Sequence, residues 1–357
     1  MTDQGQVRTI LVTGGAGFIG SNFIHLMLRK HPNYRIINYD KLTYAGNLEN
    51  LKSVDSHPNY LFVRGDIRDR EAVRKVFDAL SISIVVNFAA ESHVDRSIVE
   101  PEVFLTTNII GTQVLLDAAK DHWKLEPQDK YSRAYRPGVR FIQVSTDEVY
   151  GALGKEGLFV ETMPLLPNSP YSASKASADL IVRAYHETFG LPVNFTRCSN
   201  NYSPYQFPEK LIPLMINNCL NDKLLPVYGD GMQIRDWLHV EDHCEAIDAV
   251  LIRGQNGEIY NIGGNNERAN IEIVRLIIKT LGKGEDLISY VKDRPGHDRR
   301  YAIDSGKITS QLGWQPKHGF DEAMKETIGW YLDNREWCEA IVSGEYRNYY
   351  HKMYGSD

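Results

Sequence analysis

The feature that most constrains the fold lies near the amino terminus, where an apolar run ends in a glycine-rich loop. Residues 9–13 (TILVT) have the pattern of a short buried strand, and residues 14–20 (GGAGFIG) follow directly. Apolar residues then recur with helical spacing from Phe23 to Leu28. A strand, a glycine loop and a helix in this order favour a dinucleotide, because backbone N–H groups and the helix N-terminus can bind its pyrophosphate. The glycine spacing is GxxGxxG, which alone is also compatible with an ordinary tight turn.

Further apolar runs predict more strands of a parallel sheet, at residues 35–39, 61–64, 84–90, 139–144 and 193–197. Asp40 follows the second strand, where an acid can accept hydrogen bonds from the adenosine ribose and would repel a 2′-phosphate. This favours NAD over NADP, although the next residue, Lys41, could offset the preference. Asp66 and Ile67 follow the third strand, where they could meet the adenine. An ordinary helix cap is the alternative there, and Asp69 is the better candidate for it.

The stretch 145–151 (STDEVYG) places two adjacent carboxylates at the end of a predicted strand. Asp147 and Glu148 can take different tasks, one donating a proton and the other accepting one. Residues 171–189 predict a helix, on which Tyr171 and Lys175 lie one turn apart on one face. The lysine charge is then expected to lower the tyrosine pKa. Read alone, the acid pair could be a polar strand end, but its neighbours favour catalysis.

Polar residues crowd the loop 91–97 (ESHVDRS), which follows the predicted strand 84–90. Its position at the end of a parallel strand favours a binding site over a solvated loop. No spacing of His, Cys and Asp demands a metal here, and His93 is expected to form hydrogen bonds. Residues 101–121 predict a helix, and residues 123–137 an insertion on the surface without readable chemistry.

Composition excludes several classes of protein. The net charge of −6 over 357 residues, with both signs interspersed, argues against a nucleic-acid surface. The four cysteines have neither CxxC nor metal spacing and are expected to be reduced thiols of a cytoplasmic protein. The polar start (MTDQ) lacks the apolar region of a secretion signal, and no apolar run approaches a membrane span.

The chain is expected to form a Rossmann-type, doubly wound parallel sheet and a smaller carboxyl-terminal α/β domain. Residues 1–200 would hold the cofactor and the catalytic groups, and residues 201–357 would mainly bind substrate, with some crossing between the two. Arg235, Arg294 and His297 lie near glycines or turns, where they could bind a diphosphate, although each alone could equally form a salt bridge.

Taken together, these motifs resemble the extended short-chain dehydrogenase/reductase family. The resemblance rests on GGAGFIG, Asp40, Asp66–Ile67, FAAES and YxxxK, and it covers essentially the whole chain. Within the family, STDEVYG, ESHVDRS, YSASKAS, NNYSPYQFPEKLIP and RPGHDRRY resemble the dTDP-glucose 4,6-dehydratases. The triplet Thr146–Asp147–Glu148 distinguishes the dehydratases from their relatives, because 4-epimerases usually lack the acid pair and decarboxylases usually carry Thr-Ser-Glu. Ser203 stands where the family usually has glycine, and it would be strained if a positive φ is required.

The resemblance implies roles for individual residues. The catalytic residues would be Thr146, Asp147, Glu148, Tyr171 and Lys175. The residues that bind NAD would be Gly14, Gly17, Phe18, Ile19, Gly20, Asp40, Lys41, Leu42, Thr43, Asp66, Ile67, Phe88, Ala89, Ala90, Ser92, Thr107, Tyr171, Lys175 and Asn201. The residues that bind the substrate would be Ser92, His93, Thr146, Asn200, Glu209, Lys210, Leu211, Pro226, Tyr228, Arg235, Asn270, Arg294 and His297.

The implied reaction is the dehydration of dTDP-glucose to its 4-keto-6-deoxy product, for deoxysugars such as rhamnose. Tyr171 would take the 4-hydroxyl proton, Glu148 the C5 proton, and Asp147 would protonate the departing 6-hydroxyl. NAD⁺ would carry hydride from C4 to C6 and stay tightly bound. Helices 101–121 and 171–189 would form a homodimer interface. The alternatives are a UDP-sugar 4-epimerase or decarboxylase, and a non-catalytic nucleotide-binding protein.

Overall fold

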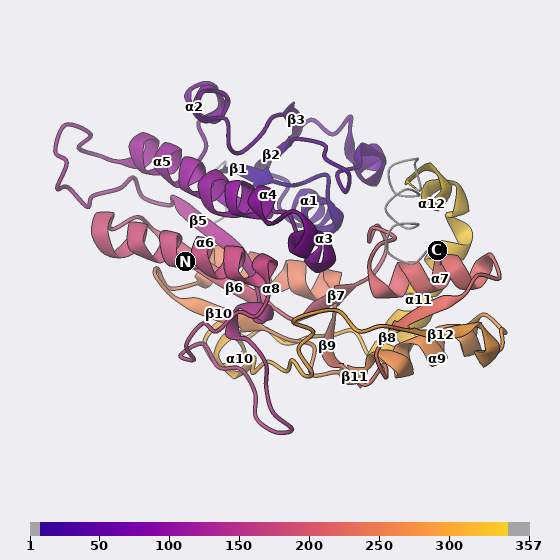
Figure 1. The fold of residues 1–357 in the computed structure, drawn as a ribbon. Coiled ribbons are helices and arrows are strands. Elements are labelled where there is room, and N and C mark those ends of the chain that lie inside the picture. The colour runs from indigo at the N-terminus through magenta and orange to yellow at the C-terminus, as the bar shows by residue number, and fades with distance from the viewer. Residues whose placement is uncertain (1–7, 342–357) are drawn as a thin grey trace.

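A seven-stranded parallel sheet forms the centre of the larger part of the molecule (Figure 1). The computed structural model describes residues 8–341. The strand order is β10-β6-β5-β4-β1-β2-β3, and each neighbouring pair is parallel. Six strands therefore have the doubly wound order expected from the sequence, and β10 adds a seventh at one edge. The strands are β1 (Arg8–Thr13), β2 (Tyr34–Asp40), β3 (Tyr60–Arg64), β4 (Ile84–Asn87), β5 (Arg140–Thr146), β6 (Val193–Cys198) and β10 (Ile259–Ile262).

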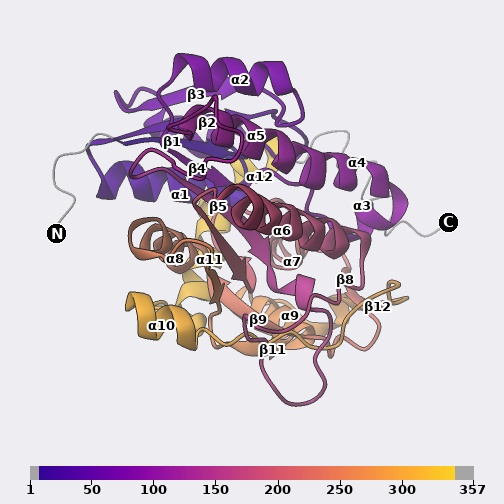
Figure 2. The same cartoon turned by 90° about the vertical axis from the view of Figure 1, so that its left-hand side faces the viewer.

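Helices cover both faces of this sheet, as Figures 1 and 2 show, because the strands carry apolar side chains on both sides. On one face lie α1 (Phe18–Lys30) and α8 (Val240–Arg253), with α10 (Gly306–Leu312) beside β10. On the other face lie α2 (Arg70–Ala79), α5 (Thr112–Trp123) and α6 (Pro170–Phe189). Asp69 caps α2 through its side chain, as the sequence predicted.

The predicted helix 101–121 is not uniform. It consists of α4 (Pro101–Leu105), the π-helical segment η2 (Thr106–Gly111) and α5. In the wide π turn, Asn108 binds both main-chain groups of Glu91, with its Oδ1 2.9 Å from the Glu91 nitrogen. Its amide also donates to the Ser174 hydroxyl of α6 at 2.8 Å. The irregular turn therefore fixes the loop after β4 against α6, a tertiary role that apolar spacing does not reveal.

A second, smaller core joins two short sheets to helices from the carboxyl-terminal half. Its strands are β7 (Asn200–Tyr202), β9 (Ile234–His239) and β11 (Glu267–Ala269) in one sheet, and β8 (Leu225–Tyr228) and β12 (Ile288–Val291) in the other. Its main helices are α7 (Leu211–Leu220), α9 (Asn270–Thr280) and α11 (Phe320–Asp333). The remaining short elements of the whole chain are η1 (Leu48–Val54), α3 (Val94–Val99), η3 (Asp147–Tyr150), η4 (Glu285–Leu287) and α12 (Arg335–Ile341).

Some boundaries differ from those expected. The stretch 208–211 (PEKL) predicts the opening of a helix, but α7 begins only at Leu211, with Lys210 as its N-cap. The elements α8 and β10 come from the carboxyl-terminal half and yet pack with the large sheet. The tyrosines predicted to pack back at the carboxyl terminus, 346, 349, 350 and 354, lie outside the described residues. Among residues 8–341, none of the helices has the length and hydrophobicity that crossing a membrane requires.

Candidate active site

A cavity of about 330 Å³ lies at the carboxyl ends of the parallel strands. Residues that directly follow β1, β2, β3, β4 and β6 line it, together with the end of β5. This is the edge of a doubly wound sheet at which ligands bind. Residues from α6 and from the segment before α7 complete the lining. The larger sheet and the start of the smaller part therefore meet at one cavity.

The glycine loop forms one wall of this cavity. Gly14 has φ +68°, and a Cβ atom there would lie 2.7 Å from the backbone nitrogen of Ala89. A Cβ on Gly20 would lie 2.3 Å from the Gly14 oxygen, so the loop closes tightly onto α1. The N-cap of α1, Gly17, has no side-chain hydrogen bond to the first turn, and Phe18, Ile19 and Gly20 line the cavity. The first-turn N–H groups therefore suit the pyrophosphate of a dinucleotide.

Asp40, at the end of β2, is held by the main chain. Its Oδ2 accepts the Ala16 N–H at 2.9 Å, and its Oδ1 accepts the Leu42 N–H at 2.7 Å. Burial raises the pKa of this carboxyl, while the two backbone hydrogen bonds act in the opposite direction. Each oxygen keeps a second lone pair, so the carboxylate can still accept from the ribose hydroxyls of NAD.

Asp66 lies in a cluster of charges farther along the cavity. Lys41 Nζ lies 3.0 Å from Asp66 Oδ2, and Arg68 Nη2 lies 2.7 Å from the same atom. Burial of Asp66 works against its ionisation, but the hydrogen bonds from Arg68 and Lys41 outweigh it and lower its pKa to about 2. Lys41 therefore pairs with Asp66. This pairing reduces the positive charge with which Lys41 could offset the preference of Asp40 for NAD over NADP.

The acid pair lies in the turn after β5. Asp147 and Glu148 open the short helix η3, whose N-cap Thr146 accepts the Glu148 N–H at 3.2 Å. The Thr146 hydroxyl donates to Asp147 Oδ1 at 3.2 Å. The other oxygen, Asp147 Oδ2, is buried and has no hydrogen-bond partner among the described residues. Such an oxygen is suited to a proton that a substrate can take up.

The two carboxyls differ in their surroundings. Burial, the charge of Glu148 and the charge of Asp236 raise the pKa of Asp147 well above its usual value. Burial also raises the pKa of Glu148, but the positive charges of Arg294, Arg235 and Lys210 act against that rise. Asp147 is therefore the better acid of the two and Glu148 the better base.

The expectation for Tyr171 was wrong in one respect. Burial, followed by the charge of Glu148, raises the pKa of Tyr171 well above 10. Lys175 lies one turn along α6, as predicted, but its ammonium donates to the Val144 carbonyl at 2.7 Å and is itself buried. The hydroxyl of Tyr171 shares a hydrogen bond with Thr146, which lowers the pKa only in part. In the chain by itself, burial and the acidic neighbours therefore hold the Tyr171 pKa above its ordinary value.

A substitution at Asp147 tests its protonation. The pKa of Asp147 is raised in the folded state. Above a pH of about 4, the unfolded state therefore binds fewer protons than the folded state does. As the pH rises, the free energy of unfolding of the unmodified chain should therefore fall relative to that of the Asp147→Asn variant. This fall should stop once Asp147 is ionised in the folded state as well. Urea unfolding of both proteins from pH 4 upward measures this difference. Parallel stability curves would contradict a raised pKa.

A second cluster of predicted residues adjoins the cavity from the carboxyl-terminal half. Arg294 Nη1 donates to Asp95 Oδ1 at 3.0 Å, and the Tyr228 hydroxyl donates to Asp95 Oδ2 at 3.0 Å. The guanidinium of Arg235 lies over the Tyr301 ring, 4.1 Å from its centroid. Arg294 Nε and Asn270 Oδ1 are buried without a hydrogen-bond partner among the described residues. Arg294 therefore leaves donor capacity for an anionic group near Glu148.

Most predicted site residues line the cavity. They are Gly14, Gly17, Phe18, Ile19, Gly20, Asp40, Lys41, Thr43, Asp66, Ile67, Phe88, Ala89, Ala90, Ser92, Thr107, Thr146, Asp147, Glu148, Tyr171, Lys175, Asn200, Asn201, Glu209 and Lys210. Leu42, His93, Leu211, Pro226, Tyr228, Arg235, Asn270, Arg294 and His297 are not among the lining residues. Leu42 acts through its N–H on Asp40, whereas His93 is buried and accepts the Arg96 N–H as the N-cap of α3.

The sequence analysis did not identify two acidic residues that act on the site, Asp95 and Asp236. Asp95 binds both Arg294 and Tyr228, and its place in the polar loop 91–97 was a signal for it. Asp236 acts on Asp147 and accepts the N–H groups of Gly264 and Asn266, at 2.8 and 2.6 Å. No local pattern marks Asp236, because its partners are about 30 residues away. Ser203 has a positive φ of 158°, the condition under which serine was expected to be strained, and its hydroxyl lies 3.1 Å from His239 Nε2.

Comparison with known proteins agrees with this geometry. The sequence model of the family described as GDP-mannose 4,6 dehydratase matches residues 11–327. A dTDP-glucose 4,6-dehydratase of Xanthomonas campestris pv. campestris is 53% identical over 350 residues, which are 96% of this chain and 98% of that protein. The chain belongs to the dTDP-glucose 4,6-dehydratase family. A relative of that name from Neisseria meningitidis is 52% identical over 353 residues, 96% of this chain and 98% of its own.

Solved structures of this family share the fold. The dTDP-glucose 4,6-dehydratase of Bacillus anthracis, in complex with NAD, has a TM-score of 0.84 and 53% identity, covering 94% of this chain and 99% of its own. The dTDP-glucose 4,6-dehydratase of Streptomyces venezuelae, with NAD and dTDP bound, has a TM-score of 0.87 and 47% identity, covering 93% and 99%. A UDP-glucose 4-epimerase of Thermotoga maritima is less similar in sequence, with 29% identity at a TM-score of 0.81, covering 91% and 99%.

Proposed function

We propose that the chain dehydrates dTDP-glucose to dTDP-4-keto-6-deoxy-glucose, as an NAD-dependent hydro-lyase. The observation that carries this proposal is the pair Asp147 and Glu148, which lines one cavity together with Tyr171 and Lys175. Besides NAD⁺ as the hydride acceptor, oxidation at C4 alone needs only the tyrosine and lysine. Removal of water across C5 and C6 also needs a base for the C5 proton and an acid for the 6-hydroxyl.

The chain's own residues supply the proton transfers. Tyr171 takes the proton of the sugar 4-hydroxyl, and Thr146, which shares a hydrogen bond with Tyr171, orients the 4-oxygen. Once C4 is a ketone, the C5 proton is acidic, and the Glu148 carboxylate removes it. Asp147 gives its proton to the leaving 6-hydroxyl, and water departs. When hydride is returned to C6, protonated Glu148 gives a proton back to C5. The raised pKa of Asp147 favours its protonated form, which can supply the proton for the 6-hydroxyl.

The glycine loop and Asp40 would hold NAD⁺, with Asp66 and Ile67 at its adenine. The bound cofactor supplies a hydride acceptor for C4, a hydride donor for C6, and a positive charge that favours an ionised Tyr171. Since NAD⁺ is regenerated in each turnover, we propose that it stays bound. Arg235, Asn270, Arg294 and His297 would bind the diphosphate of the substrate, and Pro226 and Tyr228 its nucleoside. Residues 1–200 thus serve mainly the cofactor and residues 201–357 mainly the substrate.

The direct test is incubation of the purified chain with dTDP-glucose and no added NAD, followed by mass analysis. A product lighter by one water, with the base-induced ultraviolet absorbance of a 4-keto sugar, supports both the reaction and the retained cofactor. Unchanged mass with an isomerised sugar would favour a 4-epimerase instead. No product from dTDP-, UDP- or CDP-glucose, with NAD added, would overturn the catalytic proposal.

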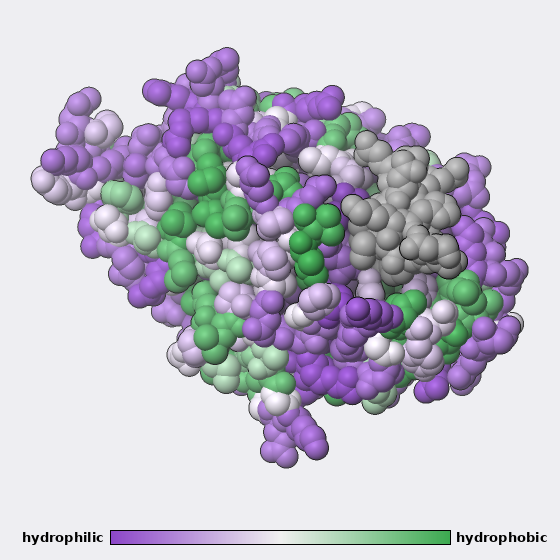
Figure 3. Space-filling view, viewed as in Figure 1, coloured by the Kyte–Doolittle hydropathy of each residue, from purple (hydrophilic) through white to green (hydrophobic). Residues whose placement is uncertain are grey.

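We also propose that the protein forms a homodimer and works in the cytoplasm. Large exposed apolar side chains gather on neighbouring helices, and Figure 3 shows hydrophobic residues over the side on which Figure 1 places α4, α5 and α6. They include Val99 (53% exposed), Leu105, Ile110 and Leu180 (56% exposed). A patch of this kind fits a second copy of the same surface related by a twofold axis. The four cysteines are all free, which supports a reducing compartment.

The dimer is tested by Leu180→Asp on α6. A charge in the centre of an apolar interface must lose its hydration, so we expect the variant to sediment as a monomer in analytical ultracentrifugation. The matched control is Leu224→Asp, because Leu224 is 61% exposed but lies between α7 and β8. The control should sediment like the unmodified chain. A dimer that survives Leu180→Asp would place the interface elsewhere.

A further inference from the structure

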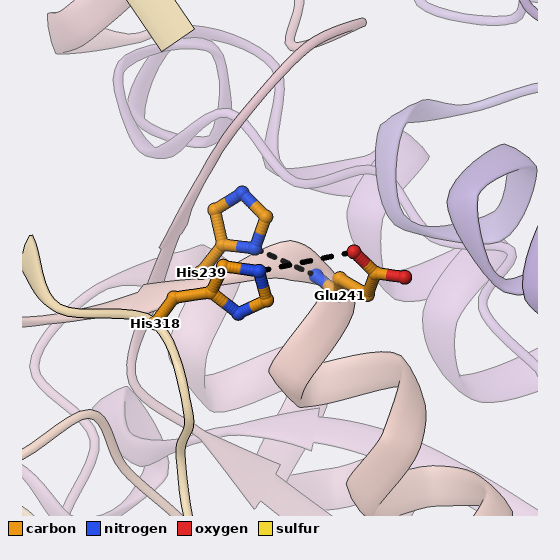
Figure 4. A group of neighbouring side chains, drawn as sticks. All are labelled: His239, Glu241 and His318. Carbon is orange, nitrogen blue, oxygen red and sulfur yellow. Dashed lines mark hydrogen bonds and ion pairs between the residues drawn. The ribbon is translucent and has the colours of Figure 1, made fainter. Parts of the chain in front are cut away.

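A group of three potential metal ligands lies outside the candidate active site. His239 ends β9, Glu241 lies in the first turn of α8, and His318 lies just before α11. One ligand atom from each residue lies within 4.8 Å of the other two. Figure 4 shows the three side chains gathered around one point. None of them lines the active-site cavity, and the reaction proposed above does not use them.

We propose that these residues bind one divalent transition-metal ion of the Zn²⁺ type. Two imidazoles and one carboxylate suit Zn²⁺ or Co²⁺, whereas Mg²⁺ and Ca²⁺ prefer sites made of oxygen atoms. The ion would join the β9–α8 junction to the segment before α11. The site therefore links α8, which packs on the large sheet, to α11 of the smaller core.

His318 is already oriented as a metal ligand. Its Nδ1 lies 2.9 Å from Asp242 Oδ1, and because a carboxylate only accepts, Nδ1 carries the proton. The lone pair is thus on Nε2, which lies 3.9 Å from Glu241 Oε2. Asp242 is fixed in turn, since its Oδ2 accepts the N–H groups of Lys317 and His318. A carboxylate behind the histidine is the arrangement that orients imidazole ligands in metal proteins.

His239 completes the group. Its ring stacks on that of His318, with centroids 4.0 Å apart and an angle of 30° between the planes. The Ser203 hydroxyl lies 3.1 Å from His239 Nε2 and holds that side of the ring. On the other side, Nδ1 accepts the Glu241 N–H at 3.4 Å, a long hydrogen bond that an ion can replace. A cavity of about 380 Å³, lined by all three residues, gives an ion access from solvent.

The distances between the ligand atoms are short enough for small side-chain movements to bring them around one ion. Zn²⁺ bonds of about 2.1 Å in a tetrahedron place two ligand atoms about 3.4 Å apart. The 3.9 Å between His318 and Glu241 is therefore only slightly too long. Both side chains are partly exposed, at 29% and 40%, so they can move. Arg29 Nη2 lies 2.5 Å from Glu241 Oε1 and competes with an ion for this carboxylate, which gives the proposal a specific test.

The experiment uses the full chain without a tag, treated with a chelator and then titrated with Co²⁺. We expect one Co²⁺ per chain, with the visible absorption of a tetrahedral nitrogen and oxygen site and without the sulfur charge transfer that binding to cysteine would give. Excess Zn²⁺ should displace it. Glu241→Gln and His318→Gln should weaken binding at least as much as the roughly 10- to 100-fold loss typical of outer-shell changes. His122→Gln, on α5, is the matched control and should bind Co²⁺ normally.

Arg29→Met should have the opposite effect, with several-fold tighter binding, because it keeps the apolar stem and removes the competing charge. The unmodified chain alone tests the site if a variant fails to fold. Absence of the tetrahedral spectrum in the unmodified chain would overturn the proposal. Binding that Glu241→Gln and His318→Gln leave unchanged would overturn it as well, since the ion would then be held elsewhere.

Discussion

Replacing Glu148 with Gln is expected to lower kcat for water loss by about 100- to 10,000-fold, the usual contribution of a general base. Gln has nearly the same shape, so KM for dTDP-glucose should change little. Glu148 is partly buried next to Asp147, and the rise of its pKa is opposed by the charges of Arg294, Arg235 and Lys210. Those positive charges keep it available as the carboxylate that takes the C5 proton. Glu156→Gln, at an exposed position of the loop after η3, is the control and should retain full activity.

Exchange of the C5 proton with deuterated water distinguishes the role of Glu148 from that of Asp147. Glu148→Gln should abolish this exchange, since no base remains for C5. Asp147→Asn should also stop the loss of water but should retain exchange at C5, because Glu148 still acts. Mass analysis of recovered sugar nucleotide measures both. Equal exchange in the two variants would refute the division of roles.

The pH dependence gives an independent check on Glu148. Because only its ionised form accepts a proton, the rate of the unmodified chain should rise with pH as Glu148 loses its own proton. Its raised pKa moves this rise above the range of an ordinary glutamate. The residual rate of Glu148→Gln should lack this acidic limb. If the limb persists, another group, such as Asp147, is the base.

The sequence was informative wherever function depends on neighbours in the chain. The glycine loop, Asp40, the triplet at 146–148 and the pair on α6 are each encoded within a few residues, and the structure places them around one cavity. Periodicity likewise predicted β1 to β6 to within one or two residues of their ends, except for β4, which stops at Asn87 rather than residue 90. It did not predict β10, the seventh strand of the large sheet. Buried parallel strands have continuous apolar runs, which few other elements imitate.

What could not be predicted depends on contacts between distant segments. Arg294 binds Asp95 across 199 positions, and the two arginines that act on Glu148 come from different parts of the smaller core. Asp236 affects Asp147 through space alone. The raised pKa of Tyr171 has the same origin, because its causes are burial and the acids of another element, Glu148 and Asp147. Spacing along one helix predicted the position of Tyr171 correctly and its ionisation wrongly.

Replacing Tyr171 with Phe is expected to stop the reaction earlier than either acid variant. The phenol oxygen is the only atom removed, and we expect a loss of about 1,000-fold or more in kcat, since no base remains for the 4-hydroxyl. Without oxidation at C4, the C5 proton is not acidic. Exchange of that proton with solvent should therefore disappear together with water loss, even though Glu148 and Asp147 are intact.

Tyr185→Phe provides the matched control on the same helix. The Tyr185 hydroxyl donates to Asp117 at 2.6 Å and does not line the cavity, so its loss should leave turnover nearly unchanged. If Tyr171→Phe retained C5 exchange while losing only dehydration, the first proton would be taken by another group. Because Tyr171 has a strongly raised pKa in the chain alone, the unmodified enzyme should also depend on bound cofactor to ionise this residue. Removing NAD should then raise the Tyr171 pKa, which ultraviolet difference titration of the tyrosinate, with Tyr171→Phe as reference, can measure.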